Sequence, residues 1–426
     1  MSIPIPNNIK TMSGTTQPKK KLFTSSDGKN YAVVFILLCT LFLLWGFSMG
    51  LIDVLNKHFQ EALHISKAKS AFVQLAYYLG YFVMAIPAGL MAKKHGYKTG
   101  IIVGLILVAL GALWAVPATR IGIFYIFLIG LFVIACGLSI LETVANPYTT
   151  VLGPPETGAV RINLAQSCNA IGQILGPLVG GQLMLSATVG ETVDSSHLAL
   201  PYIGIAILVI ILIVFFCFFK IPNIKAFDET VSKRKKDRPF WRKKHFIFAV
   251  VAQFFYMVAQ TGIFSFFINY AVDNLKNYSD RDAAELLSIG GLGLFLAGRL
   301  IGSYVLKKTV AHKTLAFYGI ANTLLMLIVI FCSGWLGVIG LLGSFFFMSI
   351  MYPTIFSLGI YGLGEQTRHA SSYIVMTLVG GTFVVVMGYI ADITNIQIGF
   401  IVPLICFFIV FIYAVFWKKL ESSDVI

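Results

Sequence analysis

A glutamate stands at the end of a long uncharged stretch of this chain. Glu142 follows the apolar run 121–141, and no lysine, arginine or histidine lies within reach along the same helix. Asn146 and Thr149, four and seven residues later, share its face of a helix, and Pro147 interrupts the backbone hydrogen bonds there. A charge at membrane depth costs at least about 2.5 kcal/mol, so a carboxylate retained there indicates function. The alternative is a carboxylate at the inner membrane interface.

Two other charged residues interrupt apolar runs. Asp53 lies towards the outer end of the run 31–55, where it is either a functional carboxylate or an interface carboxylate near Lys57. Arg299 lies within the run 281–306, and a structural ion pair, a snorkelling side chain and a transport role are all open for it. Depth alone does not decide between these roles.

Neutral polar side chains recur at helical spacing in several runs. Amides both donate and accept hydrogen bonds, so rows of them facing one cavity would suit a ligand with many hydroxyl groups, such as a sugar. Each row could instead only bond neighbouring helices, and the aromatic residues near them could be plain core. The polar candidates are Asn146, Gln166, Asn169, Gln173, Gln253, Tyr256, Gln260 and Tyr352, and the aromatic candidates include Trp45 and Phe264.

The composition places these residues in membrane helices. Of the 426 residues, 58% are hydrophobic and 12% are charged, and the mean hydropathy is +0.84, whereas a soluble protein carries about 25% charged residues. Apolar runs of about 20 residues, the length that crosses a bilayer, recur along the chain. The first run lacks a small-residue cleavage site, so we do not expect a removed signal peptide. We predict an all-α polytopic membrane protein with twelve transmembrane helices, at about 31–55, 69–92, 99–117, 121–150, 158–186, 198–220, 246–271, 281–306, 313–333, 335–361, 369–391 and 395–417.

Basic residues segregate by loop. With these spans, 25 of the 32 lysines and arginines lie on one side of the membrane, the side of both termini, and six lie on the other. The positive-inside rule therefore places both termini in the cytoplasm, and we expect a multi-pass protein of the cell inner membrane. The same segregation explains the net charge of +14 without a nucleic-acid partner.

A basic hydrophilic stretch divides the chain into two halves. We predict a disordered cytoplasmic tail over 1–30, a six-helix half over 31–220, a basic cytoplasmic linker over 221–245, a second six-helix half over 246–417 and a cytoplasmic tail over 418–426.

The two halves echo each other in sequence. The stretches 89–104 and 302–319 each run from a glycine through a Lys-Lys pair, a short turn and Lys-Thr to a second glycine, as expected of two parallel halves. The first stretch resembles the loop signature of the major facilitator superfamily, with Lys93 where an aspartate is usual and Tyr97 where a basic residue is usual. We expect structural or gating roles for Gly89, Lys93, Lys94, Gly96 and Arg299.

Cysteines and histidines give no sign of a metal centre. The six cysteines all lie in apolar runs without a Cys-x-x-Cys pair, and the seven histidines fall in loops or at helix ends. We expect neither a metal ion nor a cofactor.

Three glycines at a spacing of four mark the fifth span. Gly172, Gly176 and Gly180 would let another helix approach closely, which a moving interface also needs. Close packing is the simpler interpretation.

Several segments carry a family resemblance. They include LETVANPYTTVLG at 141–153, RINLAQSCN at 161–169, AQFFYMVAQT at 252–261, GRLIG at 298–302 and MYPTIFSLGIYG at 351–362. With these segments the chain after residue 30 resembles the fucose:proton symporter family, the fucose–galactose–glucose group of the major facilitator superfamily. The resemblance implies that Asp53 and Glu142 are the protonatable pair and that Gln166, Asn169 and Tyr352 line the central cavity.

The implied function is proton-coupled uptake of a monosaccharide, fucose or a related hexose, by alternating access. The segment 48–52 reads SMGLI where the family's fucose transporters carry several asparagines, so we expect a different hydroxyl pattern or a bulkier, less polar substituent. A non-coupled sugar facilitator and a transporter of an amino sugar such as N-acetylglucosamine are the alternatives. A membrane-embedded enzyme is not expected, because the longest loop is the basic linker. We expect a monomer in the lipid bilayer, with the sugar and protons as its partners.

Overall fold

The fold is helical throughout the part of the chain that the structure describes. The computed structural model describes residues 22–24, 29–62, 72–121, 123–185, 196–218 and 239–425. Within them, β-type pairing is limited to an isolated bridge between Thr24 and Asn30. Most of the predicted tail over 1–30 and of the predicted linker over 221–245 lies outside the described residues.

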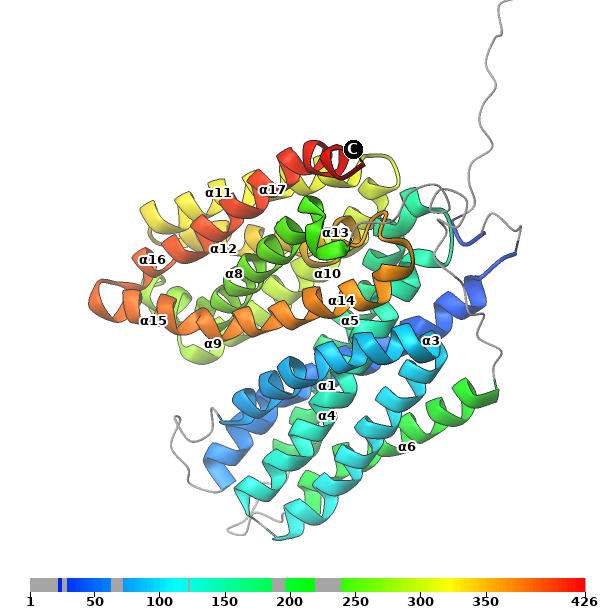
Figure 1. The fold of residues 1–426 in the computed structure, drawn as a ribbon. Coiled ribbons are helices and arrows are strands. Elements are labelled where there is room, and N and C mark those ends of the chain that lie inside the picture. Colours follow the sequence, from blue (N-terminus) through cyan, green and yellow to red (C-terminus); the bar gives the residue numbers. More distant parts are fainter. Residues whose placement is uncertain are drawn as a thin grey trace, which may run out of the picture.

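The first half is a bundle of long helices (Figure 1). Gly96 divides the longest of them into two spans, because its φ of 85° and ψ of 175° form a conformation that residues with a Cβ rarely adopt. The predicted boundary between spans two and three lies at this turn. In chain order the elements are α1 (Ala32–Ala62), α3 (Phe72–Ile121), α4 (Phe124–Val151), the 3₁₀ turn η1 (Pro155–Thr157), α5 (Gly158–Leu185) and α6 (Ser196–Phe218).

The second half is a bundle in which several spans are interrupted. Spans eight, ten and eleven each consist of two helices joined at a break or through a π or 3₁₀ segment. The elements are η2 (Phe240–Arg242), α8 (Lys244–Asn274), α9 (Asp280–Glu285), η3 (Leu286–Gly291), α10 (Leu292–Leu306), α11 (Ala311–Phe331), α12 (Trp335–Met348), α13 (Met351–Gly359), η4 (Gly364–Gln366), α14 (Thr367–Met376), η5 (Thr377–Phe383), α15 (Val384–Ile393), α16 (Ile396–Gly399) and α17 (Ile401–Val425).

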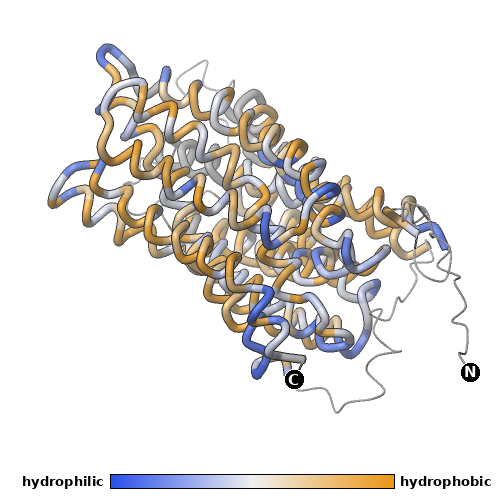
Figure 2. Tube along the Cα trace, turned by 90° about the horizontal axis from the view of Figure 1, so that it is seen from above, coloured by the Kyte–Doolittle hydropathy of each residue, from blue (hydrophilic) through white to orange (hydrophobic). Residues whose placement is uncertain are grey.

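The helices account for the twelve predicted spans. Among the described residues, nine helical stretches are long and apolar enough to cross a membrane, and one of these, Leu75–Ala118, holds the two spans on either side of Gly96. The remaining two spans are α5, whose interior carries several amides, and α6, which has a shorter apolar helix at Tyr202–Phe218. Figure 2 shows the matching pattern: apolar colour runs along the helices, and hydrophilic residues gather at their ends.

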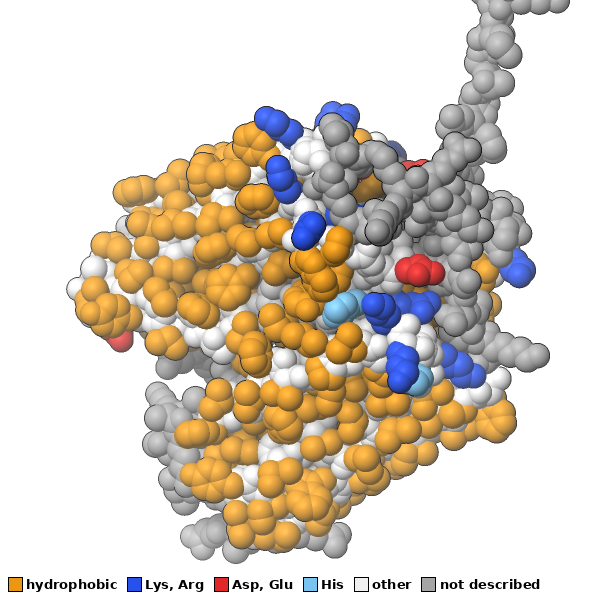
Figure 3. Space-filling view, in the orientation of Figure 1, with side chains coloured by type: hydrophobic (Ala, Val, Ile, Leu, Met, Phe, Trp, Pro, Cys, Tyr) orange, Lys and Arg blue, Asp and Glu red, His pale blue; other side chains and the backbone are white. Residues whose placement is uncertain are grey.

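Basic side chains gather at one end of the molecule, close to the C-terminus (Figure 3). We call this the basic end. The α4–α5 connection, the turn within α3 and the start of α8 all lie there (Figure 1), while the sides of both halves on the face shown in Figure 3 are covered by hydrophobic side chains. Exposed lysines in the segments at the basic end include Lys93, Lys94, Lys244, Lys307, Lys308 and Lys418.

The two halves touch through a small set of helices. Helix α14 packs against α3 and α4, and α10 and α13 pack against α5, so the first half meets spans eight, ten and eleven of the second. Figure 1 shows α14 and α5 at the boundary between the two bundles. Glu142, Gln166, Arg299 and Tyr352 lie on these helices.

Arg161 closes the junction between α4 and α5. Its fully buried guanidinium donates hydrogen bonds to the carbonyls of Thr149 at 2.9 Å and Pro154 at 3.0 Å, to the Thr157 hydroxyl at 2.6 Å, and to the carbonyl of Thr150. The last carbonyls of a helix have no partner within it, and a cation satisfies them well. Arg161 lies at the basic end, as predicted from the loop charges, but it is a buried cap rather than a solvated loop residue.

Close backbone contact joins α1 to α5. A methyl group added at Gly172 would lie 2.6 Å from the Phe47 amide nitrogen, and one at Gly176 would lie 2.6 Å from the Phe47 carbonyl oxygen. The glycine spacing in span five therefore serves close packing within the first half, and these two glycines face α1 rather than the second half.

Gly172→Ala should destabilise the protein, because an added methyl group must push α1 away from α5. Overpacking of this kind costs about 1–3 kcal/mol, and the melting temperature of the detergent-purified protein should fall. Gly204→Ala in α6 is the matched control: nothing lies within 4 Å of its added Cβ. Equal melting temperatures for the two variants would contradict the close packing.

Candidate functional site

Glu142 lies between the two halves, away from water. Its side chain is 2% exposed on α4, and the hydroxyl of Tyr352, on α13 of the other half, donates a hydrogen bond to its Oε1. Asn146, one turn along α4, is a second neutral polar neighbour of the carboxylate. The Glu142 side chain is thus buried between helices among neutral groups rather than exposed at the surface.

Gln166 connects this carboxylate region to a buried cation. Its Nε2 donates to Asn146 Oδ1 at 3.2 Å, and its Oε1 accepts from Arg299 Nη1 at 3.2 Å. The same guanidinium nitrogen also donates to the Gln166 carbonyl. Polar groups therefore follow one another from Arg299 in the second half through Gln166 and Asn146 to Glu142 in the first, and on to Tyr352 in the second, although Asn146 Nδ2 and Glu142 Oε2 have no hydrogen-bond partner among the described residues.

Arg299 is held by a carbonyl that Pro353 leaves free. In a continuous helix the Ser349 carbonyl would accept from the backbone N–H of residue 353, but proline has none. Arg299 Nε donates to that carbonyl at 3.0 Å, and the guanidinium lies 4.5 Å from the centroid of the Phe295 ring. Among the described residues its partners are neutral and its side chain is 3% exposed, so neither the ion pair nor the snorkelling alternative describes it.

Pro147 leaves a carbonyl free in the same way on α4. The Thr143 carbonyl lacks the N–H that residue 147 would have supplied, and it accepts instead from the Ser371 hydroxyl on α14 at 3.0 Å. The proline that interrupts span four in the sequence thus provides an acceptor for a hydrogen bond between the halves.

Tyr256 and its neighbours on α8 complete the second half of this region. The Tyr256 hydroxyl donates to the Met348 carbonyl at 2.9 Å, and its ring lies 6.3 Å from that of Tyr352. Gln260, one turn further on, is partly exposed. Gln253, one turn back, is fully buried, and neither of its amide atoms has a hydrogen-bond partner among the described residues.

The remaining candidates lie further from Glu142 or pack into one half. Asn169 donates to the Phe42 carbonyl at 3.3 Å and accepts from Gln173 at 2.9 Å, so its amide is occupied within the first half. The buried Trp45 ring lies 6.0 Å from Phe42. Phe264 lies 5.9 Å from Phe295 and 4.9 Å from Phe345, in an aromatic cluster of the second half. The side chain of Asp53 lies outside the described residues.

The predicted loop residues lie where the halves close at the basic end. A methyl group on Gly89 would lie 2.7 Å from the Ser372 side chain, so α3 and α14 touch there. The Arg368 guanidinium covers the Tyr97 ring at 4.4 Å, and Tyr97 stacks on Tyr148 at 4.6 Å. Lys93 and Lys94 are exposed beside this contact, and Gly96 makes the turn. Tyr97, which departs from the superfamily's signature, is therefore the aromatic partner of an arginine from the other half.

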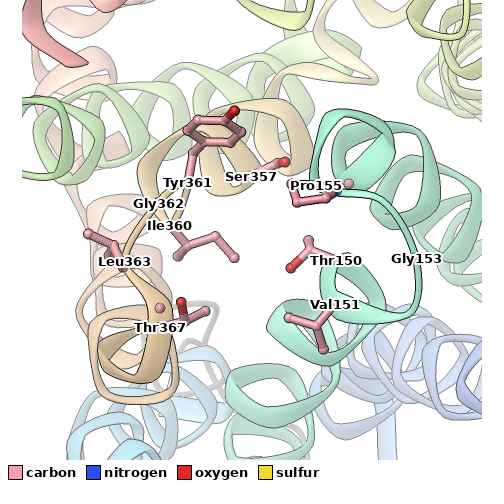
Figure 4. Close-up of a pocket in the computed structure, with 12 residues that line it drawn as sticks. Thr150, Val151, Gly153, Pro155, Ser357, Ile360, Tyr361, Gly362, Leu363 and Thr367 are labelled. Atoms are coloured by element: carbon pink, nitrogen blue, oxygen red, sulfur yellow. The ribbon is translucent and has the colours of Figure 1, made fainter. Parts of the chain in front are cut away.

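A pocket opens at the basic end, next to this closed contact (Figure 4). Thr150 and Pro155 line it from the first half, and Ser357 and Thr367 line it from the second. Thr150 is eight residues beyond Glu142, or about 12 Å along α4, so the pocket is separate from the carboxylate region.

Two parts of the site were not predicted from the sequence. Asn163 donates to the Thr354 hydroxyl at 3.2 Å across the halves, although its position three residues before Gln166 put it on the same helical face. Tyr77 and Tyr81 form a hydrogen-bonded pair at 3.2 Å on α3 and lie near enough to Glu142 to feel its charge. Their spacing of four was the available signal.

Metal chemistry has no support in the described residues. Across those ranges no group of three or more histidine, cysteine, aspartate or glutamate side chains is placed to hold a metal ion. The six cysteines are free thiols.

The comparisons with known proteins agree with this arrangement. Residues 35–384 match the model of the Major Facilitator Superfamily. The chain is 39% identical to the L-fucose-proton symporter of Escherichia coli strain K12, over 94% of this chain and 96% of that one. It is 34% identical to the glucose/galactose transporter of Brucella abortus biovar 1, over 93% and 96%. Among solved structures, the fucose:proton symporter FucP in the outward conformation matches with a TM-score of 0.81 and 38% identity, over 91% of this chain and 99% of that one.

Gln166→Leu should destabilise the sugar-free protein, because it removes the donor to Asn146 Oδ1 and one of the acceptors of the buried Arg299 guanidinium. Losing a buried partner costs about 1–3 kcal/mol, and the melting temperature should drop accordingly. Gln173→Leu, on the same helix, removes only the bond to Asn169 and should cost less. An equal or larger loss for Gln173→Leu would argue against the central position of Gln166.

Proposed function

Because this chain belongs to the Major Facilitator Superfamily, a family of transporters rather than enzymes, we propose that it carries a monosaccharide across the membrane together with protons, by alternating access. Relatives named L-fucose-proton symporter and glucose/galactose transporter align with this chain over nearly their whole length. The observation that carries the proposal is the hydrogen bond between Glu142 of one half and Tyr352 of the other.

A proton at Glu142 would act on the contact between the halves. A charged carboxylate accepts a hydrogen bond about twice as strong as a neutral acceptor does, so protonation weakens the bond from Tyr352. This change loosens the halves from each other, which is the direction required for a loaded carrier to open at its closed end.

Asp53 is the second protonatable group of the proposal. It lies in the part of α1 towards the end opposite the basic end, where protons and sugar enter in the outward state. A carboxyl group there takes the proton first, and Glu142 shares or tunes the carrier role.

The sugar would bind between the halves, against the polar side chains that surround Glu142. Its hydroxyl groups are both donors and acceptors, as are the amides and phenols present. The proposed contacts are Asn146, Gln166, Asn169, Tyr256, Gln260 and Tyr352, with the Trp45 and Phe264 rings against the apolar face of the sugar.

The basic end is proposed to face the cytoplasm, in the cell inner membrane. Exposed lysines gather at that end and around the C-terminus (Figure 3), and positively charged loops remain on the cytoplasmic side of a membrane.

Proton coupling is tested by uptake into proteoliposomes with an imposed pH gradient, acidic on the entry side. Wild type should accumulate its sugar only with the gradient. Glu142→Gln and Asp53→Asn should lose accumulation by tenfold or more while sugar exchange continues, and Glu365→Gln, an exposed carboxylate at the basic end, should behave as wild type. Gradient-independent transport by wild type would establish a facilitator instead.

Orientation is tested by labelling whole cells with a membrane-impermeant maleimide. A cysteine replacing exposed Lys276, at the end opposite the basic end, should react, whereas one replacing exposed Lys307 should react only after the cells are permeabilised. The reverse pattern would place the termini outside.

A further inference from the structure

Glu142, Asn146, Gln166, Tyr256, Arg299 and Tyr352 form the polar region described above, which we call the Glu142 network. A second set of polar side chains lies one step closer to the basic end: Asn163, Gln253 and Thr354, which we call the inner polar layer. Each stands two or three residues towards the basic end from Gln166, Tyr256 or Tyr352 on its own helix, a shift of about 3–5 Å. The layer draws on α5 of the first half and on α8 and α13 of the second.

Contacts place the three residues at one level. Asn163 Nδ2 donates to the Thr354 hydroxyl across the halves at 3.2 Å. Helices α8 and α13 run antiparallel. Tyr256 lies opposite Tyr352, with ring centroids 6.3 Å apart, and a methyl group on Gly359 would lie 2.7 Å from Ala249. Gln253, between Ala249 and Tyr256, is therefore level with Ile355, next to Thr354.

The layer holds hydrogen-bonding capacity that no described residue uses. Gln253 is fully buried, yet neither its Nε2 nor its Oε1 has a partner among the described residues, and the same holds for Asn163 Oδ1. Buried amides are almost always hydrogen-bonded, so an unpaired one requires an explanation. A partner that these amides have in another conformation of the molecule is such an explanation.

The other state is opening at the basic end. The halves are closed beyond this layer by the Arg368 contact to Tyr97 and by the approach of Gly89 to Ser372. Separation of the halves there would break the bond from Asn163 to Thr354 and uncover free donors and acceptors on facing helices. A sugar leaving the Glu142 network for the basic end must pass between them.

We propose that the inner polar layer is a second binding place for the transported sugar, occupied on its way to or from the basic end. The proposal rests on the proposed transport function, and it adds a site distinct from the Glu142 network. Unpaired amides can donate hydrogen bonds to the hydroxyl groups of a sugar and accept hydrogen bonds from them.

The test compares sugar affinity at the two ends of the protein. Right-side-out and inverted membrane vesicles are supplied with whichever labelled sugar wild type exchanges fastest among L-fucose, D-galactose, D-glucose and N-acetylglucosamine. Gln253→Leu should raise the half-saturating concentration for exchange from the basic end by about tenfold, the effect of one or two lost hydrogen bonds. The value at the opposite end should stay within about twofold of wild type.

A stability measurement separates this role from a structural one. Gln253→Leu should leave the melting temperature of the sugar-free protein unchanged or raised, because the amide has no partner to lose. Gln397→Leu is the matched contrast: its amide donates to Asn274 at 2.9 Å and to Cys332 at 3.2 Å at the opposite end, so it should lower the melting temperature and leave both affinities unchanged.

Three results would overturn the proposal. Unchanged affinity at the basic end would mean that the layer meets only water, and equal changes at both ends would assign Gln253 to the Glu142 network. A large loss of stability in Gln253→Leu would make the amide structural. Absence of exchange by wild type with every sugar of the panel would instead defeat the transport function itself, and the layer with it.

Discussion

A hydrogen bond between the Tyr352 hydroxyl and the Glu142 carboxylate ties one half of this molecule to the other inside its apolar interior. Water is excluded between the packed helices. A buried polar group therefore needs a hydrogen-bond partner within the chain, and its absence destabilises the fold. Glu142 meets this demand only in part: Tyr352 donates to its Oε1, and its Oε2 has no partner among the described residues. Its polar neighbours, Tyr352 and Asn146, are neutral, and neutral donors stabilise a charged carboxylate less than a cation would.

The prolines of spans four and ten give the network its anchoring points. Pro147 and Pro353 each remove one backbone N–H and thereby free the carbonyl four residues earlier. The Thr143 carbonyl accepts from Ser371 and the Ser349 carbonyl from Arg299. Two helix interruptions that would be destabilising alone become acceptors for side chains from elsewhere, one of them across the interface between the halves.

The polar groups between the halves also differ in how fully they are satisfied. At the level of Glu142, hydrogen bonds join Arg299 to Gln166, Gln166 to Asn146, and Tyr352 to Glu142, while one atom of Glu142 and one of Asn146 have no partner among the described residues. One step towards the basic end, neither amide atom of Gln253 has a partner in the part of the chain that the structure describes. A protein with a single conformation would gain by replacing such groups with apolar ones. The second binding place that we propose would give these groups partners once the halves open at the basic end.

The sequence by itself determined the membrane class, the twelve spans, the division into halves and the identity of Glu142 as the anomalous residue. These follow from hydrophobic length and the cost of charge, which are local properties of each segment. Helical spacing also put Asn146 on the face of Glu142.

The sequence could not show that Tyr352 is the partner of Glu142, that Arg299 bonds neutral groups, or that Asn163 reaches Thr354 across the halves. Residues 133 to 210 positions apart meet in these contacts, and periodicity along one helix says nothing about which neighbour it faces. Packing of the two halves alone decided those pairs, because it fixes the rotation and depth of each helix relative to the others.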